Sequence, residues 1–329
     1  MTTLPDTTAA LSEDEAHLAF ARILDAEVSE EEIEAFLIGL TERGETATEV
    51  AAAAGALRER LIPIAAPAHA IDVCGTGGDG HHTLNISTAV SLVVAAAGVP
   101  VAKHGNRAAS SKAGAADVLE TLGLDMVRAG ETAEASLRDI GICFLFAANH
   151  HPAMRRIQPI RQKIGRRTIF NLMGPLANPA RVGRQLIGIA RPGYVHLYAK
   201  AMAALGTEMS YIVSGDEGLD ELSLADGNEV AEVTRDGVHM MRLSASDAEL
   251  PHHPTTAIRG GDVEHNAAAL RRLLNGEAGA YRNAVLFNAA AAFRIADRVE
   301  TLPAGVALAA ETLDSGRAAA LLDRWIAYA

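Results

Sequence analysis

Residues 72–117 read DVCGTGGDGHHTLNISTAVSLVVAAAGVPVAKHGNRAASSKAGAAD, with a glycine-rich turn directly after a short apolar run. No carboxylate occurs from Gly80 to Ala116, although the whole chain carries 41 acidic and 29 basic side chains. Within that gap lie a second glycine-bearing loop, several hydroxyls and amides, and the cations Lys103, Arg107 and Lys112. Because free N–H groups and cations without nearby acids attract anions, we predict a binding site for a phosphorylated ligand.

Apolar runs of strand length alternate with helical patterns through the middle of the chain, beginning with AIDVC at 70–74. Such alternation is typical of βαβ units around a mainly parallel sheet. A polar segment around 228–243, with Asp236-Gly237 as its turn, predicts an antiparallel hairpin. We therefore predict an α/β fold whose large domain spans 67–329. Two glycine loops after neighbouring parallel strands would meet at the carboxyl edge of its sheet, where open α/β folds bind ligands.

The first sixty or so residues carry three helix-start signals of one kind, a hydroxyl followed three positions later by a glutamate. In such a capping box the two side chains satisfy free N–H groups of the first helical turn. The three pairs are Ser12 with Glu15, Ser29 with Glu32, and Thr46 with Glu49. Pro63 and Pro67 then interrupt the helical pattern. We predict a small helical domain at 1–66, joined by helices from about 152–168.

The charge and composition of the chain exclude several classes of function. A formal net charge of −12 argues against nucleic acid as a partner, because nucleic-acid surfaces are normally rich in surplus lysine and arginine. The two cysteines, Cys74 and Cys143, show neither disulfide-framework nor zinc-site spacing. The N-terminus lacks a signal-peptide pattern, and no apolar run is long enough to span a bilayer. We expect a cytoplasmic protein that binds small molecules and no membrane.

The turn Gly75–Gly80 matches the pattern G-x-G-x-x-G, which alone is weak evidence for a dinucleotide site. A dinucleotide fold also needs an acidic residue about twenty positions later to hold a ribose hydroxyl. Lys103 and His104 occupy that place here. Asp79 would repel a pyrophosphate inside the turn unless a cation or a sugar hydroxyl stood between them. A plain glycine turn is the alternative interpretation.

Residues 85–88, Asn-Ile-Ser-Thr, stand where the following helix should begin. Their hydroxyls and the free N–H groups of the first turn would hold a phosphate at the positive end of the helix. An N-cap without any ligand is the alternative.

Asp220-Glu221 follows the apolar run SYIVSG and offers two hard oxygen donors at the same predicted edge of the sheet. Magnesium prefers one or two carboxylates together with phosphates and water, whereas a solvated acidic loop is the alternative. The doublets His81-His82 and His150-His151 lack the spacing of metal ligands on a helix and are interpreted as loop residues. No nucleophile with a positioned base is apparent, so the sequence does not favour covalent catalysis.

Several motifs, in order along roughly 72–222, resemble those of the anthranilate phosphoribosyltransferases: GTGGDG, NIST, KHGNRAASSKAGAADVLE, HPAM, IRQKIG, RTIFNLMGPLANPAR and GLDEL. The resemblance implies a nucleoside phosphorylase/phosphoribosyltransferase-like two-domain fold, with homodimers formed through the helical part. It also implies the second step of tryptophan biosynthesis. In that step the 5-phosphoribosyl group of 5-phosphoribosyl 1-pyrophosphate (PRPP) passes to the amine of anthranilate, with Mg²⁺ as cofactor.

The resemblance assigns expected roles to individual residues. Contacts to PRPP are implied for Gly75, Gly78, Asp79, Thr83, Asn85, Ser87, Thr88, Lys103, Arg107, Ser110 and Ser111. Magnesium ligands would be Ser87, Asp220 and Glu221. Contacts to anthranilate are implied for Gly75, His104, Asn106 and Arg161. Arg161 suits the carboxylate because a guanidinium grips such a group through two parallel hydrogen bonds. We predict direct displacement with inversion at C1, without a covalent intermediate and with no residue assigned as acid or base.

Two positions depart from the family's pattern. Ala148 stands where many relatives have proline, on a loop that lines the anthranilate route, and Ala115 stands where serine is frequent. Two alternatives stay open, a non-enzymatic nucleic-acid-binding relative of the same fold and a pyrimidine-nucleoside phosphorylase. The acidic chain, with KHGN, Arg161 and the Asp-Glu pair intact, argues against the first. KHGN and the NLMGPLANP segment argue against the second.

Overall fold

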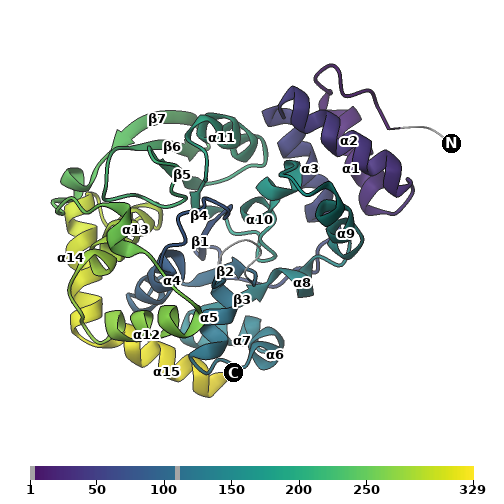
Figure 1. The fold of residues 1–329 in the computed structure, drawn as a ribbon. Coiled ribbons are helices and arrows are strands. Elements are labelled where there is room, and N and C mark those ends of the chain that lie inside the picture. The colour runs from purple at the N-terminus through teal and green to yellow at the C-terminus, as the bar shows by residue number, and fades with distance from the viewer. Residues whose placement is uncertain (1–3, 108–111) are drawn as a thin grey trace.

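The computed structural model describes residues 4–107 and 112–329, and Figure 1 shows how their helices and strands are arranged. A seven-stranded sheet in the order β3-β2-β1-β4-β5-β6-β7 forms the centre. The strands from β3 to β5 are parallel, whereas β6 and β7 pair antiparallel, which confirms the predicted mainly parallel sheet. The strands are β1 (Ile71–Gly75), β2 (Val101–Gly105), β3 (Ile142–Phe146), β4 (Arg184–Gly188), β5 (Met209–Gly215), β6 (Asn228–Thr234) and β7 (Gly237–Leu243).

The predicted hairpin is formed by β6 and β7, but its turn lies one residue earlier than expected. Thr234 pairs with Gly237, so the two turn residues are Arg235 and Asp236. Gly237 is the first residue of β7 and has a φ of +138°, which side chains rarely adopt. The glycine therefore marks the entry of the chain into β7 and not the centre of the turn.

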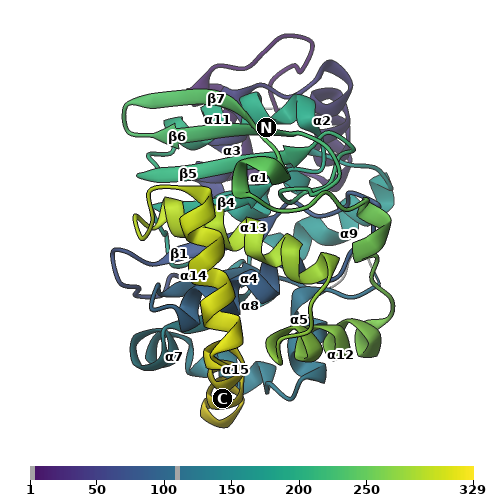
Figure 2. The same cartoon turned by 90° about the vertical axis from the view of Figure 1, so that its left-hand side faces the viewer.

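Helices cover both faces of the sheet, as Figures 1 and 2 show. α4 and α13 pack on one face, and α11 packs on the other and also contacts α3. Leu186 and Ile187 of β4 point to opposite faces, yet both are 1% exposed or less, as expected for a strand between two helical layers. The helices of this part are α4 (Ile86–Ala96), α5 (Ala115–Thr121), α6 (Met126–Glu131), α7 (Ala133–Ile140), α8 (Ala147–His150), α10 (Met173–Leu176), α11 (Val195–Ala204), α12 (Val263–Leu274), α13 (Ala280–Ile295), α14 (Leu302–Asp314) and α15 (Arg317–Tyr328).

Three short helices at the N-terminus begin where the capping boxes predict, α1 (Glu13–Leu24), α2 (Glu30–Arg43) and α3 (Ala47–Glu59). Their apolar side chains share one core cluster with Ile157 and Ile160 of α9 (Met154–Ile164). α9 therefore packs against helices more than a hundred residues earlier in the chain. The division of the chain at residue 66 stays a prediction. Within the described residues, no helix combines the length and the apolarity needed to cross a membrane.

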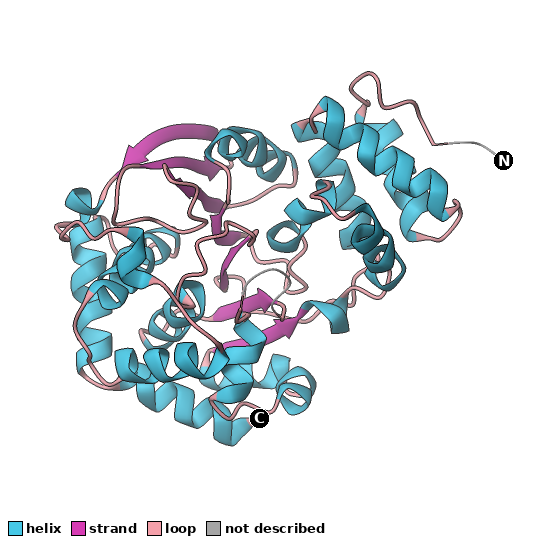
Figure 3. Cartoon of the chain, in the orientation of Figure 1, coloured by secondary structure: helices cyan, strands magenta, loops and turns pink. Residues whose placement is uncertain are grey.

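The strand order brings several loops together at one edge of the sheet. β1 lies between β2 and β4, because the chain moves from β1 to β2 on one side and later returns to β4 on the other. The loops that follow the parallel strands leave at the same edge, and Figure 3 shows them around the inner strands, with the N-terminal helices to one side. Open α/β sheets bind ligands at such a switch point.

Candidate active site

A cleft of about 750 Å³ lies at the carboxyl ends of β1, β2 and β5. Most of the predicted site residues line it, although they come from distant parts of the sequence. They are Gly75, Gly78, Asp79, Thr83, Asn85, Ser87, Lys103, His104, Asn106, Arg107, Arg161, Asp220 and Glu221. Ser110 and Ser111, predicted to contact the donor, lie outside the described residues.

Lys103 reaches the cleft from a buried position on β2. It is 2% exposed, and its Nζ donates to the carbonyl of Val73 at 2.8 Å and to Ser87 Oγ at 3.2 Å. Burial lowers the pKa of Lys103, and the charge of Asp72 opposes that shift. Asp72 is fully buried, and burial raises its pKa against the effect of Lys103. The two charges compensate each other inside the protein, so Asp72 supports the cation that faces the cleft.

Asp220 and Glu221 belong to the loop after β5, and each receives a backbone hydrogen bond from another loop. Asp220 Oδ2 accepts from the N–H of Gly77 at 2.7 Å, and Glu221 Oε1 accepts from the N–H of Ser87 at 3.1 Å. Burial, followed by the charge of Asp79, raises the pKa of Asp220 to about 7. Burial and then the charge of Asp220 raise the pKa of Glu221 well above its usual range. Burial and mutual repulsion therefore make a negative charge costly on both carboxylates, and the charge of Lys103 opposes this effect at Glu221.

The carboxylate pair fits a magnesium ion better than a metal held by the protein alone. Among residues 4–107 and 112–329, no group of three or more His, Cys, Asp or Glu side chains could hold a metal ion. Magnesium is usually bound by one or two carboxylates and completes its shell with water and substrate oxygens. Asp220, Glu221 and the hydroxyl of Ser87 match such an incomplete set of hard oxygen donors.

Two glycines make room for the loop that carries Asp220. A Cβ on Gly75 would collide with the Asp220 carboxylate, and a Cβ on Gly188 would overlap the Asp220 backbone carbonyl. Both glycines end neighbouring strands, β1 and β4. The first glycine of the predicted anion turn therefore serves the approach of a carboxylate from another loop.

The start of α4 forms one wall of the cleft, but its residues differ in accessibility. Asn85 is the N-cap without a capping side-chain bond; its amide instead donates to the Ala113 carbonyl at 3.2 Å. Ser87 lines the cleft, whereas Thr88 is 1% exposed and does not. The Oγ1 of Thr88 has no hydrogen-bond partner in the part of the chain that the structure describes. Two backbone N–H groups of this helix end already donate, that of Ile86 to the Leu84 carbonyl at 2.8 Å and that of Ser87 to Glu221 at 3.1 Å. What the helix start offers to an anion in the cleft is therefore mainly the positive end of its dipole.

Arg107 lines the cleft with its charge already engaged. Its guanidinium pairs with Asp117 at 2.9 Å and with Glu120 at 2.7 Å, and these hydrogen bonds raise its pKa. It also lies 5.9 Å from the centre of the Phe146 ring. A donor phosphate would have to compete with two carboxylates for this side chain.

Arg161, in contrast, is a half-buried cation without an acidic partner. Its Nη1 donates to Gln158 Oε1 at 3.3 Å, and no carboxylate in the described part of the chain forms an ion pair with it. Burial lowers its pKa. Asn106 lines the same cleft and accepts the N–H of Arg107 at 2.9 Å. Ala148 is exposed on α8, and its neighbour Ala147 lines the cleft instead.

His104 is fixed by hydrogen bonds at both ring nitrogens. Nδ1 lies 2.9 Å from the Gly174 carbonyl, and Nε2 lies 3.3 Å from Nε2 of His151. Because a carbonyl only accepts, Nδ1 carries the proton and Nε2 accepts from His151. Burial, and then the charge of His151, lowers the pKa of His104 to about 3. His104 is therefore a neutral ring at physiological pH.

Comparison with known proteins agrees with this geometry. The models described as the glycosyl transferase family, a/b domain, and its helical bundle domain match residues 67–319 and 6–61. Anthranilate phosphoribosyltransferase from Sphingopyxis alaskensis is 68% identical over 324 residues, which are 98% of each chain. The chain belongs to the anthranilate phosphoribosyltransferase family. The family member from Erythrobacter litoralis is 67% identical over the full length of both chains.

Solved structures of the anthranilate phosphoribosyltransferase family share the fold. The crystal structure of the Thermus thermophilus enzyme matches with a TM-score of 0.90 and 43% identity, covering 97% of this chain and 96% of that one. The Saccharomyces cerevisiae enzyme in complex with PRPP and Mg matches with a TM-score of 0.88 and 27% identity, covering 97% and 93%. Another structure of the yeast enzyme contains 4-fluoroanthranilate.

Sequence reasoning missed three residues that shape this site. Asp72 sits inside an apolar strand pattern, where only its charge gave a signal. His151 was interpreted as a loop residue, yet it hydrogen bonds to His104. Arg167, within the family-like motif RTIFNLMGPLANPAR, donates to the Gly77 carbonyl at 2.8 Å and contacts the glycine turn directly.

Proposed function

We propose that this cleft transfers the 5-phosphoribosyl group from PRPP to the amine of anthranilate, giving N-(5-phosphoribosyl)anthranilate and pyrophosphate. This is the second step of tryptophan biosynthesis. One observation carries the proposal. The unpaired guanidinium of Arg161 shares a single cleft with a glycine-rich anion turn and a pair of buried carboxylates. The guanidinium suits an acceptor that carries a carboxylate. The glycine-rich turn and the two carboxylates suit a phosphorylated donor that binds together with a cation.

The donor occupies the side of the cleft formed by the turn after β1, the start of α4 and the end of β2. The positive end of the α4 dipole and the charge of Lys103 would hold its phosphate oxygens. Gly75, Gly78, Asp79, Thr83, Asn85, Ser87 and Lys103 line this side, which supports their assignment. Arg107, Ser110 and Ser111 complete the proposed set, whereas the burial of Thr88 away from the cleft argues against its predicted contact.

Ser87, Asp220 and Glu221 would hold Mg²⁺. When bound, magnesium supplies positive charge that stabilises the pyrophosphate leaving group and offsets the repulsion between the carboxylates. The hydrogen bonds from Gly77 to Asp220 and from Ser87 to Glu221 keep both carboxylates oriented toward the cleft. The raised pKa values of both groups support a cation here, because each charge is costly while it lacks a partner.

Anthranilate occupies the side near α9, where Arg161 binds its carboxylate and Gly75, His104 and Asn106 form the surrounding wall. An aromatic amine is a neutral nucleophile and needs little activation. The protein therefore acts by positioning and by electrostatic stabilisation of the leaving group. We propose direct displacement with inversion at C1 and assign no general base. The low pKa of His104 keeps this ring uncharged beside the acceptor.

The sequence also led to predictions of the oligomeric state, the cellular location and the partners of the protein. We propose homodimers formed through the N-terminal helices, and the 63% exposed Leu18 on α1 supports an apolar contact there. A cytoplasmic location and the absence of a nucleic-acid partner stay predictions. The comparisons above support neither alternative raised from the sequence, a nucleic-acid-binding relative or a pyrimidine-nucleoside phosphorylase.

The decisive experiment is to follow the loss of anthranilate fluorescence after mixing the protein with PRPP and MgCl₂. We expect decay that needs the donor and the metal and that stops when EDTA is added. No decay in a folded protein that binds PRPP would reject anthranilate as acceptor. Phosphorolysis of a pyrimidine nucleoside would favour the phosphorylase instead.

A further inference from the structure

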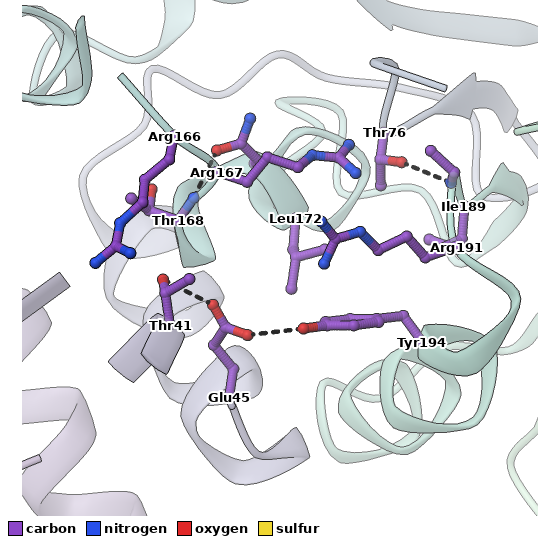
Figure 4. Close-up of a pocket in the computed structure, with 12 residues that line it drawn as sticks. Thr41, Glu45, Thr76, Arg166, Arg167, Thr168, Leu172, Ile189, Arg191 and Tyr194 are labelled. Carbon is purple, nitrogen blue, oxygen red and sulfur yellow. Dashed lines mark hydrogen bonds between the residues drawn. The ribbon is translucent and has the colours of Figure 1, made fainter. Parts of the chain in front are cut away.

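A second cavity, of about 230 Å³, lies between the N-terminal helices and the large α/β part (Figure 4). A water molecule takes up roughly 30 Å³ of liquid volume, so this cavity has room for a small polyatomic ligand. It shares Thr76, Arg166, Arg167 and Asn171 with the lining of the cleft and is therefore adjacent to it. Its remaining lining residues are Thr41, Glu45, Thr168, Leu172, Ile189, Ala190, Arg191 and Tyr194.

Two guanidinium groups dominate the charge of this cavity. Figure 4 shows the side chains of Arg167 and Arg191 extending into the space beside Tyr194. Arg167 donates to the Gly77 carbonyl, and Arg191 lies 5.6 Å from the centre of the Tyr194 ring. Neither forms an ion pair with a carboxylate among the described residues. Burial, and then the charge of Arg191, lowers the pKa of Arg167, so the two cations repel each other.

Two hydroxyl groups add unused donors to the same cavity. Thr168 is 3% exposed, and its Oγ1 has no hydrogen-bond partner within residues 4–107 and 112–329. The Thr76 hydroxyl accepts the N–H of Ala190 at 3.3 Å, which leaves its own hydrogen free to donate. A buried hydroxyl without a partner is costly unless a ligand or water satisfies it.

The other charged groups around the cavity, Glu45 and Arg166, already have partners, neutral hydroxyls for Glu45 and a carboxylate for Arg166. Glu45 accepts hydrogen bonds from the Tyr194 hydroxyl at 3.1 Å and the Thr41 hydroxyl at 3.2 Å. Arg166 pairs with Glu42 at 2.9 Å. The free binding capacity of the cavity therefore lies with Arg167, Arg191 and the two threonine hydroxyls, all of which donate.

We infer that this cavity binds a phosphate-type oxyanion at Arg167 and Arg191, beside the hydroxyls of Thr76 and Thr168. Planar guanidinium forks match the tetrahedral oxygens of phosphate, and the anion removes the repulsion between two facing cations. The oxyanion has two possible sources, free inorganic phosphate and the pyrophosphate that the reaction releases. The second source rests on the proposed function.

The position of Arg167 gives such an anion a route to the active cleft. This side chain lines both cavities and donates to the glycine turn that is proposed to hold the donor. An oxyanion that leaves the turn meets the same guanidinium in the second cavity. Occupancy of the cavity and the conformation of the turn are therefore coupled through one side chain.

The direct test is calorimetric titration of inorganic phosphate into protein saturated with PRPP and MgCl₂, without anthranilate so that no turnover occurs. We expect one phosphate per chain, with binding weakened about tenfold or more by Arg191→Gln. Thr168→Val should weaken it as well, through the loss of one neutral donor. Arg235→Gln, a distant arginine, should leave the affinity unchanged. Absence of phosphate binding, or equal binding in all these variants, would overturn the inference.

A second arm identifies the source of the anion. Pyrophosphate inhibition is measured against PRPP in the wild type and in Arg191→Gln. If released pyrophosphate uses the cavity, the wild type shows a noncompetitive component that the variant lacks. If the component is the same in both but phosphate still binds in the calorimeter, the ligand is free phosphate. Should PRPP fail to bind at all, titration of phosphate into the free protein still tests the cavity separately from the proposed function.

Discussion

The carboxylate of Asp220 accepts a hydrogen bond from the backbone N–H of Gly77 at 2.7 Å, which joins two loops 143 residues apart in sequence. One loop follows β5 and carries the proposed magnesium ligands, and the other follows β1 and forms the proposed donor turn. The orientation of the metal ligands and that of the anion site therefore depend on the same contact.

Asp220→Asn should lower the activity of the protein without lowering its stability. Removal of one preorganised charge is expected to lower kcat/KM by about 100-fold or more and to weaken the dependence on magnesium. The raised pKa of Asp220, about 7, means that its stabilising effect is present below about pH 4 and lost as the pH rises through 7. The metal-free variant should therefore be at least as stable as the wild type at pH 8. Thermal unfolding without metal checks this; a marked loss of stability would contradict it.

Gly188→Ala should damage the site from within the sheet. A Cβ at this position would overlap the Asp220 carbonyl, so the loop must move. We expect destabilisation of about 1–3 kcal/mol, as in overpacked cores, together with a loss of activity. Gly193→Ala is the matched control, because a Cβ there meets no atom within 4 Å. Urea unfolding of both variants makes the comparison, and similar values for the two would count against this account.

Lys103→Met should destabilise the protein because it leaves the carboxylate of Asp72 buried without its cation. Breaking a buried pair from one side typically costs about 3–5 kcal/mol. Asp72→Asn in the same chain removes the uncompensated charge and should recover part of that loss. Urea unfolding of the two single variants and the double variant at pH 7 measures the coupling. Additive effects would show that the two charges do not compensate each other.

His104 should make the fold sensitive to acid. Its pKa is lowered to about 3, so below pH 6.5 the unfolded chain binds a proton that the folded protein does not. Lowering the pH from 7 to 5 should therefore cost about 2 kcal/mol of stability through this group. His104→Gln should lose that sensitivity, and His239→Gln, an exposed histidine on β7, should keep it. Unfolding free energies of the wild type and both variants at the two pH values test this prediction. Equal losses in all three proteins would contradict it.

Arg161→Ala should weaken anthranilate binding by about 10- to 100-fold, because charge-assisted hydrogen bonds to a carboxylate contribute roughly 1.5–3 kcal/mol. Arg161→Lys should lie between that variant and the wild type, since lysine keeps the charge but lacks the planar fork. PRPP affinity should stay within about twofold, as the donor is proposed to bind elsewhere in the cleft. Arg155→Ala, an exposed arginine on the same helix, is the control. Calorimetric titration of each variant with anthranilate and, separately, with PRPP measures the two affinities.

Local spacing made much of the fold predictable. The hydroxyl-glutamate pairs at Ser12, Ser29 and Thr46 fixed three helix starts, because a capping box forms within one helical turn. Strand and helix periods indicated the parallel sheet for the same reason. The hairpin turn was misplaced by one residue, because a glycine just after a turn and one at its centre look alike in sequence.

The helix starts, the α/β alternation and the chemical types that gather in the cleft can be read from the amino-acid sequence, because these depend on residues close together in the chain. The compensation of Lys103 by Asp72, the hydrogen bond from His151 to His104 and the shared cavity of Arg167 and Arg191 arise only in the folded chain. Such contacts depend on strand order and on the packing of α9 and the N-terminal helices against the sheet. No local pattern encodes a distance between side chains that the folding of the whole chain brings together.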